Sequence, residues 1–514
     1  MRLDKTKNAV RNVGYGFLNK ITSMLLPFAV RTVFIRVLGV EYLGLSSLFS
    51  SVLMVLSLTE LGFSSAIVYH MYKPIAEDDT ATINALLQFY KSVYRAIGCI
   101  ILAVGCLLIP VLPHLIKGTP PAGINLTAIY LIYLVNTAAS YFLFAYYSSL
   151  ISAFQRRDLI SKTNILVSFV MHMVQILCLL TVKNYYAYIA IMPVFTILNN
   201  LRIRAVARKV FPEYHPEGMI STDMKRDIRQ KVSGLMISKV SAVSRNAFDS
   251  IFISMFLGLA DTAMYNNYYY IMNAITGVMV MFTTSITAGV GNSVALDSVE
   301  TNYRNMKKMN FLYIWLSGWC SICLLCLYQP FMKLWVGESL MFPMGTVILI
   351  CMYFYVLKIG DIRSIYVNTK GVWWETRYRA ILESIANIVL NYVLGKYYGV
   401  NGIVLATLIS LFCINFLYGS RIIFRYYFGM EKIKDYFLSN LKYAVATVIA
   451  AAFTFGICSG IHLDSIIGLF LKAAVCVVVP NLLYWAFYRK TGEYQLAVPW
   501  IMQKLPKRFR KKRV

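Results

Sequence analysis

Long apolar segments recur along the whole 514-residue chain, and they constrain its fold more than any other feature. A helix needs roughly 20 apolar residues to cross the ~30 Å hydrocarbon layer of a bilayer, because its backbone polar groups must be paired internally. Hydrophobic residues make up 58% of the chain and charged residues only 14%, which is more apolar surface than one soluble core of this length needs. The pattern therefore predicts an all-α, polytopic membrane protein.

About fourteen transmembrane helices are predicted, and the longest polar interval between them is 202–231. The first six are expected at 13–37, 43–70, 88–112, 124–152, 160–181 and 185–203. The next six are expected at 232–257, 264–290, 309–336, 341–369, 378–396 and 400–424, and a final pair at 440–460 and 466–488.

The distribution of basic residues predicts the orientation of the chain. With the N-terminus in the cytoplasm, only four lysines fall in external segments: Lys117, Lys183, Lys333 and Lys396. Cytoplasmic loops of membrane proteins are enriched in Lys and Arg, so both termini are predicted to be cytoplasmic. The net charge of +27 and the basic tail then indicate membrane anchoring at anionic lipid and not nucleic-acid binding.

A weak internal repeat divides the first twelve predicted helices into two halves. A shift of 219 residues places Val13 on Val232, Lys20 on Lys239, and Leu38-Gly39 on Leu257-Gly258. Six helices per half give both halves the same orientation, so we expect two pseudo-symmetric six-helix lobes around a central cavity, plus a C-terminal helix pair. The predicted parts are an N-lobe at 1–205, a cytoplasmic linker at 206–231, a C-lobe at 232–430, the helix pair at 431–490 and a basic cytoplasmic tail at 491–514.

Ionisable residues inside predicted spans are the first functional candidates, since they are costly in lipid and usually face a cavity or a partner. Lys20 and Arg31 are eleven residues apart, which brings them to nearly the same face of one helix. The seventh span carries Lys239, the repeat partner of Lys20. It also carries Arg245 and Asp249, which are four residues apart and can form an ion pair. The alternative is that these cations orient the helices or snorkel toward a membrane face.

The tenth and eleventh spans carry two further polar groups. Lys358, Asp361 and Arg363 lie at membrane depth if the tenth helix continues past Leu357; otherwise they form a charged cytoplasmic turn. Glu383, Asn387 and Asn391 are spaced by four, with Arg379 one turn before them, so they share one helix face. Polar contact between helices explains that spacing as well as substrate binding does.

The embedded cations outnumber the embedded acids, which include Glu60 in the second span. Arg and Lys in a low-dielectric cavity stabilise an anion, so an anionic substrate is the expected partner. Asp249, Asp361 and Glu383 are candidates for binding a coupling proton or sodium ion. Asn387 and Asn391, together with abundant Tyr, suit a polar cavity wall.

No catalytic or metal site is predicted. Cys320, Cys323 and Cys326 form a CxxCxxC pattern, but no His accompanies them, and Cys in a lipid-facing helix is commonly a small apolar residue. No Walker A loop is present, so no nucleotide cofactor is expected. Transport would then be driven by an ion gradient or by the gradient of the substrate.

Two segments resemble a known family. Residues 31–44, RTVFIRVLGVEYLG, and 58–66, LTELGFSSA, resemble the opening helices of polysaccharide (Wzx-like) flippases. Residues 395–407, GKYYGVNGIVLAT, are similar to the outer turn before the twelfth helix of that family. These flippases belong to the multidrug, oligosaccharidyl-lipid and polysaccharide (MOP) exporter superfamily, and the resemblance extends over nearly the whole chain.

The resemblance implies two six-helix lobes around a cavity that opens alternately to each side of the bacterial cytoplasmic membrane. It implies a non-enzymatic flippase for undecaprenyl-diphosphate-linked oligosaccharide, with membrane lipids and other polysaccharide-assembly proteins as partners. Cavity cations of the family are thought to hold the diphosphate, and the residues that match by depth are Lys20, Arg31, Lys239, Arg245, Lys358 and Arg363.

Three alternatives remain at this point. A multidrug exporter of the same superfamily would favour an anionic pocket, and a lipid II flippase would share most of the pattern. A polytopic glycan polymerase would need a sizeable extracytoplasmic loop, whereas the external connections predicted here are short.

Overall fold

The computed structural model describes residues 5–60, 63–121, 123–463 and 465–504, and within these ranges helices are the only regular elements. Ten of the helices in these ranges are long and apolar enough to cross a membrane, or eleven if one bent pair counts as a single span. The predicted all-α, multi-pass class is therefore confirmed. The predicted number of fourteen transmembrane helices is not confirmed.

The chain forms two compact units, Met1–Ala263 and Met264–Val514. The first unit includes the helix at 222–256, which packs against the second and third helices of the chain. The five-part division made from the sequence stays a prediction.

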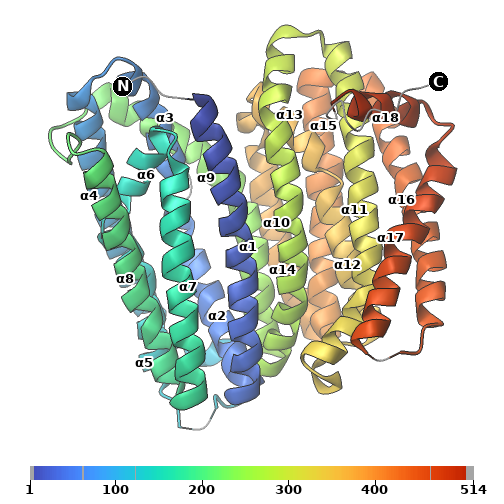
Figure 1. Ribbon diagram of the computed structural model, residues 1–514, viewed down its shortest axis with the longest axis horizontal. Coiled ribbons are helices and arrows are strands. Elements are labelled where there is room, and N and C mark those ends of the chain that lie inside the picture. The colour runs from blue at the N-terminus through green and yellow to red at the C-terminus, as the bar shows by residue number, and fades with distance from the viewer. Residues whose placement is uncertain (1–4, 61–62, 122, 464, 505–514) are drawn as a thin grey trace. The chain divides into compact units, whose positions relative to one another are not determined.

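The first unit is built from helices joined by short connections (Figure 1). They are α1 (Lys5–Val37), α2 (Val40–Leu56), α3 (Phe63–Ala76), α4 (Thr80–Leu107), α5 (Leu126–Phe142), α6 (Tyr146–Ala153), α7 (Arg157–Thr181), α8 (Tyr185–Val210) and α9 (Thr222–Phe256).

Two spans predicted as continuous are broken in this unit. The span at 43–70 is divided between α2 and α3, with the 3₁₀ turn η1 (Ser57–Glu60) after α2. The span at 124–152 bends by 46° between α5 and α6. Phe144 has a φ of 59° at that bend, a left-handed conformation that cannot continue a right-handed helix.

The second unit starts within α10 (Leu259–Leu296) and runs to the C-terminus. Its helices are α11 (Val299–Trp335), α12 (Met344–Lys358), α13 (Asp361–Lys370), α14 (Trp373–Ile409), α15 (Gly419–Ile423), α16 (Ile433–Ser459), α17 (Ile466–Tyr488) and α18 (Gly492–Lys504). The π-helical segment η4 (Ser410–Tyr418) links α14 to α15, and a second one, η5 (Phe424–Phe428), follows α15.

The element α14 contains a sharp reversal at Gly399, where φ is 58° and ψ is −137°. The chain then packs back on itself, and the Asn387 side chain reaches Thr407 on the returning part. This reversal separates the segments predicted at 378–396 and 400–424. A second interruption, at Gly360, divides the span predicted at 341–369 into α12 and α13.

The two glycines of the predicted repeat landmark share a backbone conformation. Gly39 precedes α2 with a φ of 98°, and Gly258 precedes α10 with a φ of 111°. Side chains with a Cβ rarely adopt these angles, which explains glycine at both positions.

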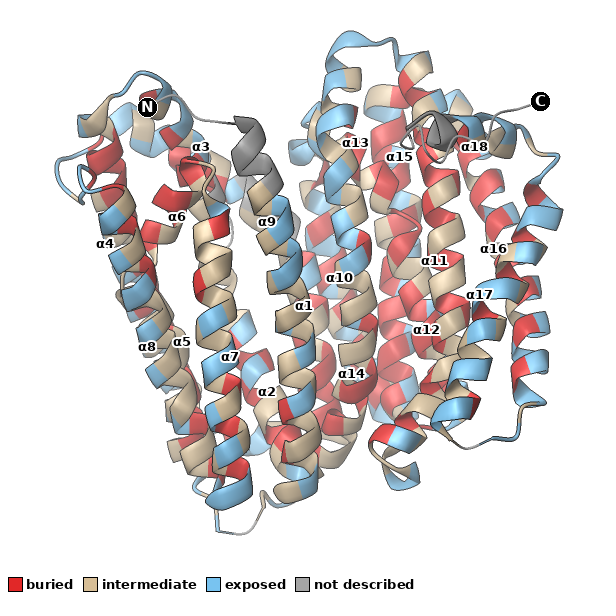
Figure 2. Cartoon of the chain, in the orientation of Figure 1, coloured by how far each residue is buried: buried red, intermediate tan, exposed pale blue. Residues whose placement is uncertain are grey.

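Burial differs among the helices of the second unit (Figure 2). In α11, more than half of the most apolar stretch is buried, whereas α17 exposes large apolar side chains such as Ile467 and Phe470. Exposed apolar surface of this extent is stable only against lipid or another protein. The helix α11 is thus the core of the unit, and α17 supplies apolar outer surface.

Candidate functional site

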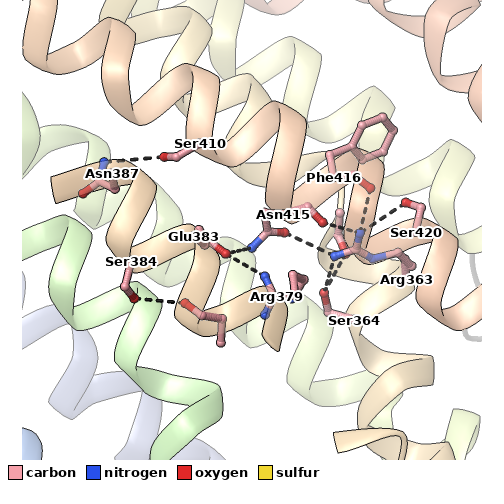
Figure 3. Close-up of polar contacts among 12 residues, drawn as sticks. Arg363, Ser364, Arg379, Glu383, Ser384, Asn387, Ser410, Asn415, Phe416 and Ser420 are labelled. Atoms are coloured by element: carbon pink, nitrogen blue, oxygen red, sulfur yellow. Dashed lines mark hydrogen bonds and ion pairs between the residues drawn. The ribbon is translucent and has the colours of Figure 1, made fainter. Parts of the chain in front are cut away.

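Among the described residues of the second unit, Arg363 is the most enclosed cation, with 2% of its surface exposed. It lies on α13, and its Nη1 donates to the carbonyl oxygens of Asn415 at 2.7 Å and Phe416 at 3.1 Å (Figure 3). Its Nη1 also donates to the hydroxyl of Ser420, and its Nη2 to the Oδ1 of Asn415. Asn415 and Phe416 belong to the π-helical segment η4, so this backbone irregularity contributes the carbonyl oxygens of the guanidinium site, and α15 contributes the hydroxyl of Ser420.

Glu383 on α14 connects this site to a second guanidinium. Its Oε2 accepts from Arg379 Nη1 at 2.7 Å and from Asn415 Nδ2 at 2.9 Å. Asn415 therefore binds Arg363 through its oxygen and Glu383 through its nitrogen (Figure 3). Arg363, Arg379, Glu383 and Asn415 are hereafter the Arg363–Glu383 cluster.

Glycine at position 419 leaves room for both guanidinium-bearing side chains. A Cβ there would lie 2.8 Å from Nη1 of Arg363 and 2.9 Å from Cδ of Arg379. Real Cβ atoms do not approach other atoms this closely. The cluster therefore depends on the absence of a side chain at Gly419.

Asn387 and Asn391 extend the polar face of α14, as their spacing predicts. Both are buried, and Asn387 Nδ2 donates to Thr407 at 3.1 Å, between the two halves of α14. Nδ2 of Asn391 lies 3.5 Å from Oδ1 of Asn387. Their contacts are of the interhelical kind, and a role in a cavity wall stays a prediction.

Lys358 and Asp361 form a separate ion pair next to the break at Gly360. Nζ of Lys358 lies 3.0 Å from Oδ2 of Asp361, which also accepts from the Tyr313 hydroxyl at 2.6 Å. Lys358 is 3% exposed and the Asp361 side chain 28%, so the cation is enclosed by protein and the acid is partly exposed where the helix is interrupted.

The two acids do not balance the cations of this region. Lys358, Arg363 and Arg379 outnumber Asp361 and Glu383, so these five residues together carry one net positive charge. An apolar cavity of about 700 Å³ lies between α11, α12, η4 and α16, and none of these five residues lines it. Phe416, whose carbonyl binds Arg363, contributes to the lining of that cavity.

The predicted cations of the first unit lie on α1 and α9. Lys20 and Arg31 are half-buried, and Arg31 interacts electrostatically with Tyr188. Arg245 and Asp249 are buried one turn apart on α9. The side chain of Lys239 lies outside the described residues. Substrate and coupling-ion roles for these residues, and for Lys358, Asp361, Arg363 and Glu383, stay predictions.

Glu60, a half-buried acid of the first unit, has partners of a different kind from those of the second unit's acids. Glu60 accepts hydrogen bonds from the hydroxyls of Tyr94 and Tyr141, the latter at 3.0 Å. These three residues are hereafter the Glu60 cluster. The sequence marked Glu60 as an embedded acid but gave no sign of its tyrosine partners, which come from α4 and α5.

Three solved structures resemble this chain. A lipid II flippase MurJ in an inward closed conformation has 16% sequence identity and a TM-score of 0.67, and the match covers 94% of this chain and 99% of that one. An inward-facing multidrug resistance MATE family transporter of the MOP superfamily has 14% identity and a TM-score of 0.61, with 78% and 94% covered. A point mutant of the Vibrio cholerae MATE transporter VcmN has 16% identity and a TM-score of 0.56, with 82% and 97% covered.

These similarities define the class: the chain is a multi-pass membrane protein with the fold of MOP-superfamily transporters. A family model for polysaccharide biosynthesis proteins matches residues 9–287, more than half of the 514 residues. The chain belongs to this polysaccharide biosynthesis protein family. A search of curated protein sequences found no match.

Proposed function

We propose that this protein is a flippase that moves undecaprenyl-diphosphate-linked oligosaccharide across the bacterial cytoplasmic membrane for cell-surface polysaccharide biosynthesis. The observation that carries the proposal is membership of the polysaccharide biosynthesis family. The MOP transporter fold supplies the means, alternating access, and no catalytic step is part of the proposal. Both termini lie on the cytoplasmic side, in keeping with the basic tail.

The chemistry of the second unit supports an anionic, lipid-linked cargo. Such a molecule has a long apolar chain and a charged diphosphate, which need different surroundings. The apolar cavity of about 700 Å³ suits the chain, and the excess positive charge beside it suits the diphosphate.

Lys20, Arg31, Lys239, Arg245, Lys358 and Arg363 are the proposed phosphate-binding residues. Asp249, Asp361 and Glu383 are the proposed acceptors of a coupling proton or sodium ion, and Asn387 and Asn391 the proposed polar contacts of the cavity. Arg363 already binds backbone carbonyls, so direct phosphate contact requires exchange of those hydrogen bonds during the transport cycle.

Lipid II is the second candidate cargo. The MurJ match covers 94% of this chain, and MurJ is described as a lipid II flippase. A multidrug substrate has less support, because the charges among the polar residues of the second unit favour an anion and not a cationic drug.

The cellular test is loss and rescue of surface polysaccharide. Deletion of the gene abolishes the polymer at the cell surface, and the wild-type gene restores it. Lys20→Gln fails to restore it at unchanged protein level. Arg36→Gln is the matched control on the same helix, since Arg36 is exposed, and it restores the polymer fully. Normal export by Lys20→Gln removes that residue from the proposal, and normal surface polysaccharide in the deletion strain overturns the function.

A further inference from the structure

Three cysteines from three different helices converge in the second unit. They are Cys326 on α11, Cys458 near the end of α16 and Cys476 on α17, and all three are buried. Their Sγ atoms lie within 4.8 Å of one another, and those of Cys458 and Cys476 are 4.0 Å apart. Cys320 and Cys323, which complete the CxxCxxC pattern on α11, are not part of the group.

The spacing fits coordination of one metal ion by sulfur. Metal–thiolate bonds of about 2.3 Å, arranged in a trigonal plane, place the three sulfur atoms about 4.0 Å apart. One of the three separations already has this value, and contraction by less than about 1 Å brings the others to it. If these cysteines served only as small apolar residues in the helix packing, their three thiol groups would not need to lie together.

A cavity reaches two of the three cysteines and has two methionine side chains in its wall. It has a volume of about 250 Å³ and is lined by Cys326 and Cys458 together with Met341 and Met344. Thiolate and thioether ligands select soft d¹⁰ ions, and Cu(I) accepts three sulfur ligands whereas zinc in structural sites takes four. No His, Asp or Glu lines this cavity among the described residues.

We propose that Cys326, Cys458 and Cys476 form a Cu(I)-binding site that fastens α16 and α17 to α11. Binding of Cu(I) releases two thiol protons to solvent and leaves the third thiol protonated, so the site carries one net negative charge. The Lys472 side chain lines the same cavity and offsets that charge. The site is separate from the Arg363–Glu383 cluster and does not depend on the proposed transport function.

Titration of the purified, reduced full-length protein with Cu(I), against a chromophoric Cu(I) chelator, tests the proposal. The wild type retains one Cu(I) per chain, and X-ray absorption shows only sulfur in the first coordination shell. Cys458→Ser weakens binding at least tenfold, and the triple Cys326→Ser, Cys458→Ser, Cys476→Ser variant loses it. Cu(I) also raises the melting temperature of the wild type but not that of the triple variant.

The double variant Cys320→Ser, Cys323→Ser is the matched control, because it removes two half-buried thiols from the same helix and keeps full binding. Three outcomes overturn the proposal: no Cu(I) retained by the wild type, equal loss of binding in the control, or a Cys458–Cys476 disulfide that persists after treatment with a reductant. The wild-type titration decides the matter even if a variant does not fold.

Discussion

The Glu60 cluster and the Arg363–Glu383 cluster place a carboxylate inside their helical units by different means. Glu60 is held by two neutral tyrosine hydroxyls, whereas Glu383 is held by a guanidinium and an amide that also binds a second guanidinium. Replacing the Glu60 carboxylate leaves no cation without its partner, because its donors are neutral. Replacing the Glu383 carboxylate removes the negative charge beside two guanidinium groups.

The largest expected effect separates these two acids directly. Glu383→Gln removes the charge that pairs with Arg379, and breaking one side of a buried ion pair costs about 3–5 kcal/mol. Glu60→Gln keeps an oxygen for one tyrosine hydroxyl, and its amide group donates to the other, so it costs about 1 kcal/mol or less. Thermal unfolding in detergent measures both variants, and equal destabilisation would refute the contrast.

Crowding of the Arg363–Glu383 cluster has the next largest effect. Gly419→Ala places a Cβ against both Arg363 and Arg379 and destabilises the protein by about 1–3 kcal/mol. The matched control is Gly456→Ala on α16, where a Cβ meets nothing within 4 Å, and it is neutral or slightly stabilising. If Gly419→Ala and the control have the same change in melting temperature, the claim that Gly419 packs closely against Arg363 and Arg379 is wrong.

Removal of one tyrosine hydroxyl tests the Glu60 cluster. Tyr141→Phe deletes one of the two hydroxyl donors of that cluster and costs about 1–2 kcal/mol. In the Glu60→Gln background the same change costs less, because an uncharged acceptor is weaker. The four melting temperatures form a double-mutant cycle, and strict additivity would show that the hydroxyl and the carboxylate do not interact.

The smallest effect is expected for an acid outside the predicted spans. Hydrogen bonds from Lys231 and His70 lower the pKa of Asp227 below its ordinary value of 3.8. The stabilisation is present above the unfolded-state pKa and is lost as the pH falls through the lower folded-state pKa. Asp227 is half exposed, so Asp227→Asn costs under about 1 kcal/mol at pH 7. The difference from wild type should begin to shrink as the pH falls below about 4 and vanish only below the lowered folded-state pKa.

Regular patterns in the sequence predicted the helices and the residues that share a helix face. Contacts between residues far apart in the chain were not predicted. Apolar length predicted the helical, membrane-spanning class, and the four-residue spacing on α14 predicted the shared face of Glu383, Asn387 and Asn391. Continuous hydrophobicity concealed the break at Ser57–Glu60, because an apolar run does not mark a change of helix direction. The break at Gly360 lies where one of the two alternatives for the tenth span ended the helix, near Leu357.

The spacing of residues along one helix does not indicate which residues of other helices contact them. Asn415 was a single amide in an apolar segment, and only the structure shows it between Arg363 and Glu383. The CxxCxxC pattern drew attention to Cys320 and Cys323, while Cys326 meets cysteines from two later helices. One cysteine in each of three apolar segments was the available sign, but only the tertiary fold brings them together.

The central claim is that the cargo carries a diphosphate on a long apolar chain. Purified protein in liposomes, given a fluorescent undecaprenyl-diphosphate oligosaccharide, tests it most directly by measuring how fast the label moves between leaflets. We expect rapid movement of this lipid, competition by an unlabelled diphosphate lipid, and no movement of an analogue whose diphosphate is replaced by a neutral linker. Equal movement of the neutral analogue would contradict the account.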